Sequence, residues 1–469
     1  MSEPVGDLAI VLHSHMPYVE GFGTYPFGEE WLFDAVVRSH LPVLDIARDL
    51  TLTVTPVLAD QLEAPGVAER LREFLVEHRL GAAEKDIESA NPEYRDAAIA
   101  ERDRYQRALD VLDRHDGDAL GAFAGAADSG RVSLAASSAT HAVLPLLATR
   151  AGLDLQVETG VSSHRRRFGW QGGFWLPECA YRPGLEWDLA RSGVEWFCVD
   201  QSRHEPGEDS LMPVATEAGP VAFTIDWEAI SWLWDMQGYP SWTGYLDFHR
   251  LSMNGVRIFR IDGEPYDSEA AAAHAATQAD SFLEDVAERL GQYREKTGEA
   301  GLLTFAVDTE LLGHWWSEGP AWLERVLEGA AGKGVNLVTL DQAAGGRKRE
   351  ADLAGSTWGE EKDFRTWDDP AVADLCWGAR KLELRVTRAV AAGMDRAAAE
   401  RAVRELLAVQ SSDWAFLDNR KQAGDYPYQR TLDHASEAFD ALQSRPHVPI
   451  DSRVRSLAPD LSLSPLLIP

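Results

Sequence analysis

Leu8-Ala9-Ile10-Val11-Leu12 is an apolar run that ends at the polar triplet His13-Ser14-His15. A short and wholly apolar run is typical of a strand that is buried on both faces, as in a parallel sheet. Similar runs recur up to residue 340, and stretches with helical spacing separate most of them. These further expected strands are 52–58, 132–136, 172–176, 195–199, 302–307 and 335–340. Strands that alternate with helices predict an α/β fold with a parallel sheet, either open or closed into a barrel.

Two other parts of the chain have helical patterns and few strand formers. Residues 66–128 are rich in Ala, Glu, Arg and Leu and predict a run of helices. Residues 371–392 and 396–409 also have helical spacing, and Asp395 is placed to cap the second of these helices. The chain therefore has three expected parts, namely a barrel-type domain with helical insertions, a helical domain packed on it and an irregular tail, at residues 1–345, 346–445 and 446–469.

The composition indicates which kinds of molecule the chain can bind. The chain has 469 residues, and its 76 acidic and 45 basic side chains give a net charge of −31. Nucleic acids and anionic membranes bind basic patches, so this charge argues against both partners and favours a neutral substrate. The three cysteines are scattered, and no segment has the pattern of a signal peptide or a membrane span. These features predict a cytoplasmic protein.

Two distant segments each place a carboxylate among aromatic and apolar residues. Residues 173–181 read GFWLPECAY around Glu178, and residues 305–316 read FAVDTELLGHWW around Asp308. An ionised carboxylate in apolar surroundings costs several kcal/mol, so such a group is usually paired, protonated or functional. Glycosidases place one carboxylic acid and one carboxylate on either side of a glycosidic bond. The chain also has 16 tryptophans, whose flat faces suit the apolar faces of sugar rings.

Four polar residues follow expected strands. His13, His141, Glu178 and Asp308 each lie directly after, or a few residues beyond, such a strand. In parallel α/β folds the chemistry takes place at the carboxyl ends of the strands. The shared position is the physical argument that these four side chains converge on one site.

Each residue also has a structural interpretation when it is taken alone. Glu178 is four residues from Arg182 and is placed to pair with it, and Asp308 or Glu310 is placed to cap a helix. A lone histidine beside apolar residues, such as His141, is more often structural than catalytic. The functional interpretation gains weight because a strand, a carboxylate and aromatic residues occur together twice.

A metal site is a further possibility at the first strand. His13 and His15 are two positions apart in an extended segment and therefore face the same way, so with a carboxylate they form a potential ligand set. No His-Glu-x-x-His spacing accompanies them. The metal interpretation therefore stays secondary.

The chain resembles glycoside hydrolase family 57, and within it the 1,4-α-glucan (glycogen) branching enzymes. The family motifs occur in order as LHSHMPY at 12–18, THAVLP at 140–145, WLPECAY at 175–181 and DTELLGHWW at 308–316. Supporting segments are PFGEEW at 26–31, GYP at 238–240 and QSSDWAF at 410–416. The resemblance extends from about residue 6 to about residue 440.

The resemblance implies an incomplete (β/α)7 barrel, with Glu178 as the nucleophile and Asp308 as the general acid/base. It also implies a set of glucan-binding side chains, some of them from the C-terminal helical domain. These are His13, His15, Trp31, His141, Arg250, Phe259, His314, Trp358, Trp367 and Asp413. The family requires no metal and no other cofactor.

Two departures from the family pattern concern the choice of acceptor. Branching enzymes of the family carry a long loop, with a tyrosine over the active site, after the strand that follows the nucleophile motif. Residues 200–213 form a short counterpart here and contain no tyrosine. Phe259 stands where the family usually has a tryptophan after the GYP segment. A shorter lid excludes less water from the reaction.

The sequence therefore predicts a retaining enzyme that cleaves α-1,4-glucosidic bonds of amylose, glycogen or maltooligosaccharides. Transfer to a glucan 6-hydroxyl makes it a branching enzyme, with raised hydrolysis because the lid is short. The alternatives are an α-amylase-like hydrolase, a glucan-binding protein with weak catalysis, and a metal-dependent deacetylase with a metal at His13 and His15.

Overall fold

The computed structural model describes residues 4–23, 26–89, 91–204, 208–443 and 456–467. β1 (Gly6–Ser14) lies in a parallel sheet between β2 (Leu50–Val54) and β8 (Leu302–Asp308), with β3 (Val132–Ala135) beyond β2. β9 (Val335–Leu337) pairs with the first residues of β1. The register places His13 level with both Thr53 and Asp308.

The second sheet continues the first around the barrel wall. β4 (Gly173–Phe174), β5 (Trp196–Val199) and β7 (Val221–Thr224) run parallel, and β6 (Val214–Ala215) and β10 (Arg349–Glu350) extend this sheet beyond β7. A parallel bridge between Ala136 and Phe174 joins the two sheets after β3. At the other seam, the Asp226 N–H donates to the Thr304 carbonyl at 2.8 Å. The predicted incomplete (β/α)7 barrel is confirmed.

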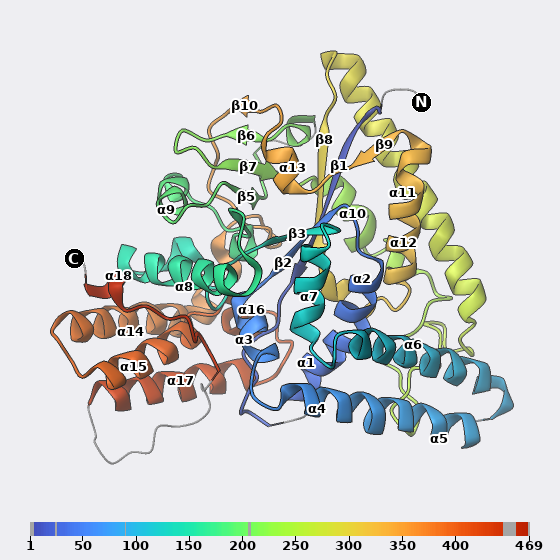
Figure 1. Cartoon of the computed structure of the whole chain (residues 1–469), viewed down its shortest axis with the longest axis horizontal. Helices are drawn as coiled ribbons and strands as arrows, with labels where there is room; N and C mark the ends of the chain where they lie inside the picture. The colour runs from blue at the N-terminus through green and yellow to red at the C-terminus, as the bar shows by residue number, and fades with distance from the viewer. Residues whose placement is uncertain (1–3, 24–25, 90, 205–207, 444–455, 468–469) are drawn as a thin grey trace.

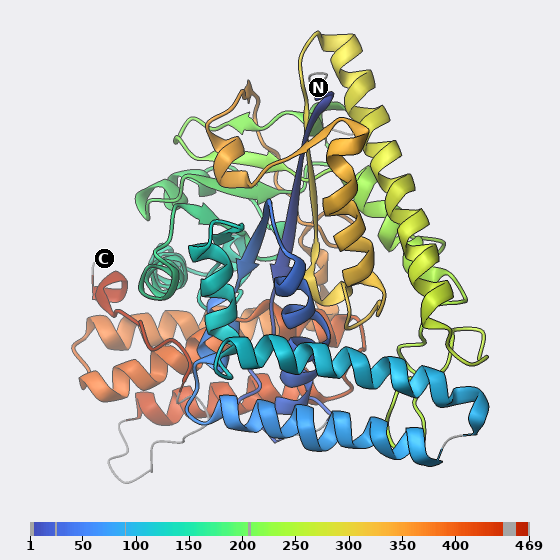
Figure 2. The same ribbon diagram turned by 45° about the vertical axis from the view of Figure 1, so that its right-hand side comes forward.

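Helices cover the outside of the barrel. They are α1 (Glu29–Ala35), α2 (Leu41–Ile46), α3 (Pro56–Leu62), α4 (Val67–Glu73), α5 (Gly81–Ser89), α6 (Arg95–Arg114), α7 (Ala119–Asp128), α8 (Arg150–Phe168), α9 (Leu185–Arg191), α10 (Trp227–Trp234), α11 (Ser268–Thr297), α12 (Gly319–Gly329) and α13 (Leu340–Ala344). The helices α11 and α12 flank β1 and β8, as Figures 1 and 2 show from two directions. None of the helices in the described ranges has the length and apolar character that a membrane span requires.

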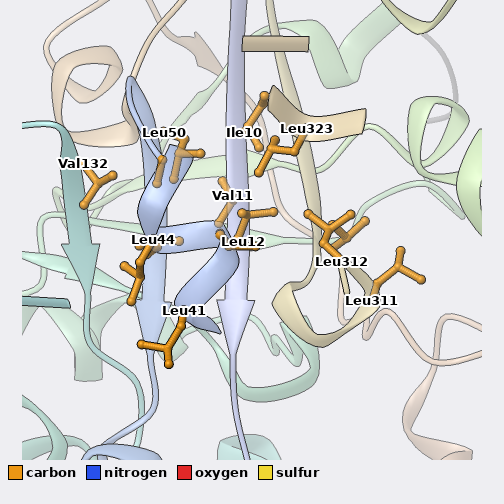
Figure 3. Packing of buried hydrophobic residues seen from close by; sticks show 14 of the residues in the cluster. Ile10, Val11, Leu12, Leu41, Leu44, Leu50, Val132, Leu311, Leu312 and Leu323 are labelled. Atoms are coloured by element: carbon orange, nitrogen blue, oxygen red, sulfur yellow. The ribbon is translucent and has the colours of Figure 1, made fainter. Parts of the chain in front are cut away.

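The barrel core is built on β1. Residues 8–12 are fully buried, and Figure 3 shows Ile10, Val11 and Leu12 packed among leucines of α2 and α12 and of the loop after β8. Burial of one such aliphatic side chain stabilises the fold by about 1.5–3 kcal/mol. This packing fixes β1, and with it the position of His13 at the end of the strand.

The C-terminal part is helical, as the sequence predicts. It contains α14 (Ala373–Ala391), α15 (Arg396–Val409), α16 (Ser412–Asn419) and α17 (Tyr426–Leu442). The predicted cap is present, because the Asp395 carboxylate accepts from the Ala398 N–H at 3.1 Å. The apolar cluster of these helices includes Tyr18, Val57 and Leu155 of the barrel part. The two parts therefore share one interface, and the strands β1 and β2 point toward it (Figure 2).

The tail has more structure than the sequence indicates. Residues 446–455 and 468–469 of the predicted irregular tail lie outside the described residues. The described part contains the short helix α18 (Ser464–Leu467), which packs on α8 and α14. Leu457 and Leu466 are buried there and anchor the segment. The three domain boundaries stay a prediction.

Candidate active site

A cleft of about 840 Å³ opens at the carboxyl ends of the barrel strands. Most of the residues predicted for the site line it. They are His13, His15, Trp31, His141, Glu178, Asp308, His314, Trp358 and Asp413. The predicted convergence of residues from β1, β8 and the segments after β3 and β4 is therefore present in the structure.

Glu178 sits in a backbone turn that few residues adopt. Its φ is 60° and that of Cys179 is 48°, both in the left-handed region. A residue other than glycine in this region costs of order 1–3 kcal/mol, and such positions cluster at functional sites. The Trp358 N–H donates to the Glu178 carbonyl at 2.9 Å and holds this turn in place. The turn aims the carboxylate of Glu178 into the cleft.

Two donors hold the Glu178 carboxylate. The Trp358 indole Nε1 donates to Oε2 at 2.9 Å, and the Ser412 hydroxyl donates to Oε1 at 2.7 Å. Burial raises the pKa of Glu178, and these two hydrogen bonds oppose that rise. Donors of this kind favour the ionised form of a carboxyl group. Arg182, the sequence-level candidate for a structural partner, pairs instead with Asp188 at 3.5 Å.

Asp308 is the last residue of β8 and has a different environment. Burial raises its pKa well above the ordinary value, and the nearby carboxylates of Glu310 and Glu178 raise it further. Within the described ranges, no hydrogen bond contributes to its charge state. Asp308 stands at the N-cap position of the turn Thr309–Leu311, but its side chain makes no capping hydrogen bond. The environment therefore favours the protonated form, which can donate a proton.

The two carboxyl groups thus differ in the way that the sequence predicts for an acid and a nucleophile. Both line one cleft, and each has its pKa raised by burial. Hydrogen bonds from Trp358 and Ser412 oppose that rise at Glu178, although its net pKa stays raised, whereas no hydrogen bond opposes it at Asp308 among the described residues. The separation of about 5–5.5 Å that a retaining mechanism requires stays a prediction.

Three histidines form a stack beside the carboxylates. The His13 and His141 Nε2 atoms are 3.0 Å apart, and the ring centroids of His15 and His141 are 4.1 Å apart. Burial lowers the pKa of both His13 and His141, so both are neutral near pH 7. Neutral imidazoles can donate and accept hydrogen bonds, as sugar hydroxyls require.

His15 has the opposite charge tendency. Burial by itself lowers its pKa, but the Asp413 carboxylate, 3.0 Å from Nε2, outweighs that effect and the net pKa is raised. Asp413 belongs to α16, so the C-terminal helices supply this partner. The sequence predicts both residues but not their pairing.

The ring nitrogens of His13 and His15 give no support to a metal site, because each of them contacts another side chain. His13 Nδ1 contacts the Thr53 hydroxyl at 2.5 Å, and His15 Nδ1 contacts that of Thr55 at 3.0 Å. Their Nε2 atoms are engaged with His141 and Asp413. In the described part of the chain, no three His, Cys, Asp or Glu side chains form a group that could hold a metal ion.

Three residues predicted for the groove lie elsewhere. Trp367 is only 2% exposed and packs in an apolar cluster with Val143 and Ala180, behind the cleft wall. The Arg250 guanidinium lies 4.1 Å from the centre of the Phe259 ring, and neither side chain is among those that line the cleft. A tryptophan in a polar loop looks exposed from sequence, but the fold here buries Trp367 against α14 and α16.

The structure also brings in residues that the sequence analysis did not single out. One wall of the cleft contains Asp34, which pairs with His314 at 3.1 Å and with Arg257 at 3.5 Å. Burial lowers the pKa of Arg257 to about 10. The Arg257 guanidinium also donates to the His314 carbonyl at 2.7 Å. No sequence pattern around Arg257 marks it, because its partners are far away along the chain.

Glu310 has a further role near Asp308. It accepts from the His15 N–H at 3.1 Å and from His40 Nε2 at 2.7 Å. His40 ends the π-helical turn Val36–His40, and such turns often occur at functional sites. A Cβ on Gly313 would lie 1.9 Å from the carbonyl oxygen of Arg38, so only glycine lets the loop after Glu310 pass this turn.

The short loop at residues 200–213 does not line the cleft in its described parts, 200–204 and 208–213. Glu205, Pro206 and Gly207 lie outside the described residues. Two tryptophans from other segments do line the cleft. They are Trp234 at 45% exposure and Trp315 at 40%, with ring centroids 6.3 Å apart.

Comparisons with known proteins agree with this geometry. The model of glycosyl hydrolase family 57 matches residues 9–353, and the model of the C-terminal domain of 1,4-alpha-glucan branching enzyme matches residues 379–453. The chain is 32% identical to a 1,4-alpha-glucan branching enzyme of Thermococcus kodakarensis, over 92% of this chain and 72% of that protein.

Two solved structures share the whole architecture. The GH57-type branching enzyme of Pyrococcus horikoshii superposes with a TM-score of 0.90 at 29% identity, over 99% of this chain and 97% of that one. The alpha-amylase AmyC of Thermotoga maritima superposes with a TM-score of 0.86 at 25% identity, over 99% of each chain. Both have the barrel and the C-terminal helices in common with this chain.

Proposed function

The chain belongs to glycosyl hydrolase family 57, with the C-terminal domain of its branching enzymes, and we propose that it acts on α-1,4-glucans by retaining double displacement. The observation that carries this proposal is the pair of carboxyl groups, Glu178 and Asp308, that line one cleft. Glu178 is held by two donors, whereas Asp308 has its pKa raised by burial and by two carboxylates. The high negative charge of the chain suits a neutral glucan.

In the first half-reaction, Asp308 protonates the glycosidic oxygen while Glu178 attacks the anomeric carbon. The bond to the leaving glucan breaks, and an ester between Glu178 and the glucosyl group forms. In the second half-reaction, the Asp308 carboxylate takes the proton of an acceptor hydroxyl, which attacks the anomeric carbon and releases Glu178. A glucan 6-hydroxyl as acceptor gives a branch, and water gives hydrolysis.

The remaining cleft residues bind the glucan. The rings of His13, His15 and His141 line the cleft, and a sugar hydroxyl that binds them must exchange with the side chains that their nitrogens contact here. Trp31 and Trp358 present aromatic surface to the cleft. No residue in this mechanism requires a metal or other cofactor. A cytoplasmic location stays a prediction.

The balance of transfer and hydrolysis depends on how much water reaches the glucosyl-enzyme. None of the described residues of the loop 200–213 lines the cleft, which supports raised hydrolysis compared with relatives that have a long lid. Trp234 and Trp315 at the cleft mouth are placed to cover part of it instead. An α-amylase-like hydrolase is the second candidate, and the absence of the described loop residues from the cleft lining favours it.

Incubation of the purified chain with amylose tests the proposal. After debranching, the new α-1,6 linkages are counted against new reducing ends, with the Glu178→Gln variant as the blank. We expect both products, with more reducing ends per branch than a long-lid relative gives. If branches far outnumber reducing ends, the short loop has no effect on hydrolysis. If reducing ends form without branches, the chain is a hydrolase.

A further inference from the structure

The backbone turn that carries Glu178 is supported by a second segment, residues 354–363, which we name the Trp358 segment. Tyr181 and Ser356 form an antiparallel bridge with both hydrogen bonds, at 2.9 and 3.0 Å. Trp358 then donates twice to Glu178, through its backbone N–H and through its indole, each at 2.9 Å. The position of the nucleophile therefore depends on the position of the Trp358 segment.

Lys362 fastens this segment to the barrel. Its φ is 57°, and the turn closes because the Lys362 N–H donates to the Gly359 carbonyl at 2.9 Å. The side chain is 12% exposed, and Nζ lies 2.8 Å from an oxygen of Asp200, which is fully buried. Nζ also lies 2.8 Å from the centre of the Trp227 ring, and such a cation–π contact adds to the attraction.

The short loop after β5 makes further contacts with the Trp358 segment. The Gln201 amide donates to the Ala354 carbonyl and accepts from the Ala354 N–H, each at 2.9 Å. Arg203 donates to the Glu361 carbonyl at 2.9 Å. The described residues 200–204 thus bind the Trp358 segment, although none of them lines the cleft.

We propose that Lys362 and Asp200 form a lock that positions Glu178 through Trp358, so that the short loop acts as a support for the nucleophile. The inference rests on the proposed function, because it assigns Glu178 the role of nucleophile. Lys362 is a positioning residue, since it touches Trp358 and Asp200 but not the cleft. A buried ammonium next to a buried carboxylate holds one geometry, because either charge is costly without the other.

The test uses the full chain with Lys362→Met, Asp200→Asn and both changes together. The fluorinated donor 5-fluoro-α-maltotriosyl fluoride, which forms a long-lived ester with the nucleophile, measures the first half-reaction. We expect Lys362→Met to slow ester formation about tenfold, because small displacements of a reacting group cost large factors in rate. KM for amylose should stay within about twofold, since Lys362 does not touch the glucan.

A structural readout is independent of activity. The Trp358 amide is bonded to the Glu178 carbonyl, so its hydrogen exchange reports whether the segment stays in place. We expect exchange about tenfold faster in Lys362→Met and in Asp200→Asn, with partial rescue by Lys362→Arg. Lys348→Met is the matched control, because Lys348 is exposed and, among the described residues, donates a hydrogen bond to the nearby Gly346 carbonyl alone.

The outcomes separate the two proposals. If the wild-type chain does not cleave amylose or form the ester, the proposed function fails, while the exchange measurement still tests the lock. If the wild-type chain is active and the Lys362 and Asp200 variants match the control in rate and exchange, the lock is overturned. The lock also fails if the double variant loses as much rate as the two single variants together, because the effects of changing two members of one pair do not add. Asp200→Asn keeps the size of the side chain and remains informative if Lys362→Met does not fold.

Discussion

The two carboxyl groups of the cleft are carried by two unlike pieces of structure. Asp308 ends β8, a regular strand of the barrel, with φ −62° and ψ 133°. Glu178 lies on a left-handed turn, and its side-chain partners Trp358 and Ser412 both come from beyond residue 345. The barrel alone thus positions the proposed acid, Asp308, whereas the proposed nucleophile, Glu178, needs the C-terminal part of the chain.

This difference in surroundings shows how a carboxyl group can serve in two different roles. A carboxyl group that is buried without donors keeps its proton, and one that receives two hydrogen bonds loses it more easily. The strand end and the supported turn therefore give the two carboxyl groups different environments, which match the proposed roles of acid and nucleophile. The predictions below test this division from the largest expected effect to the smallest.

Glu178→Gln removes the group that forms the ester. We expect kcat on amylose to fall by about ten-thousandfold or more, because no other side chain in the cleft replaces a nucleophile. Steady-state assays measure the loss, and in Glu178→Ala, where the shortened side chain leaves room, added azide should restore turnover by attacking the anomeric carbon and displacing the leaving group. Activity within about tenfold of wild type would contradict the assignment.

Asp308→Asn removes the proton donor but leaves the nucleophile in place. Turnover of amylose should fall about a thousandfold, because the leaving oxygen then departs without a proton. An α-maltooligosyl fluoride, whose leaving group needs no proton, should still form the ester at a rate within about tenfold of wild type. Equal losses on both substrates would show that Asp308 does not act as the acid.

Ser412→Ala tests the support of the nucleophile from the C-terminal part. Loss of the 2.7 Å hydrogen bond to Glu178 removes a donor that favours the ionised form, so the pKa of Glu178 rises. The acidic limb of the pH–kcat profile should therefore move to higher pH, and kcat should fall about tenfold. Ser129→Ala, a change at the end of α7 far from the cleft, should leave the profile unchanged.

Asp308→Asn also has a small effect on stability. The raised pKa means that folded Asp308 holds its proton more tightly than the unfolded chain does, so ionisation opposes folding as pH rises above the unfolded value. A neutral amide avoids this cost, and the melting temperature of Asp308→Asn should exceed that of wild type by about 2 °C at pH 8. This difference in melting temperature should shrink toward pH 4, and calorimetry at pH 4 and pH 8 measures it. A difference that is the same at both pH values would contradict the effect.

Much of the barrel can be predicted from the sequence, because its strands are buried on both faces and read as apolar runs. The run Leu8–Leu12 and the run 302–307 both match strands that pair side by side. The expected strand at 52–58 is shorter in the structure, since Pro56 begins α3 and cannot donate to a strand partner. β7 (Val221–Thr224) is not among the strands expected from the sequence, although it is as long as β3 and β5, which are both expected.

In the site, too, some features can be predicted from the sequence and others cannot. Glu178 and Asp308 stand out in the sequence because each is a charge among aromatic residues. The pairing of His15 with Asp413, 398 positions apart, depends on how the C-terminal helices dock. The same holds for Ser412 on Glu178 and for Arg257 beside Asp34. The local sequence pattern shows which residues are unusual. It does not show which side chains from distant parts of the chain contact them.

The central claim, that Glu178 is the nucleophile and Asp308 the acid/base, is tested most directly by locating the trapped ester. The wild-type chain is inactivated with 5-fluoro-α-maltotriosyl fluoride, digested and mapped by mass spectrometry. The account predicts one added maltotriosyl unit on the peptide that contains Glu178, and none on that peptide in Glu178→Gln. A label on Asp308 or Glu310, or turnover without any covalent label, would contradict it.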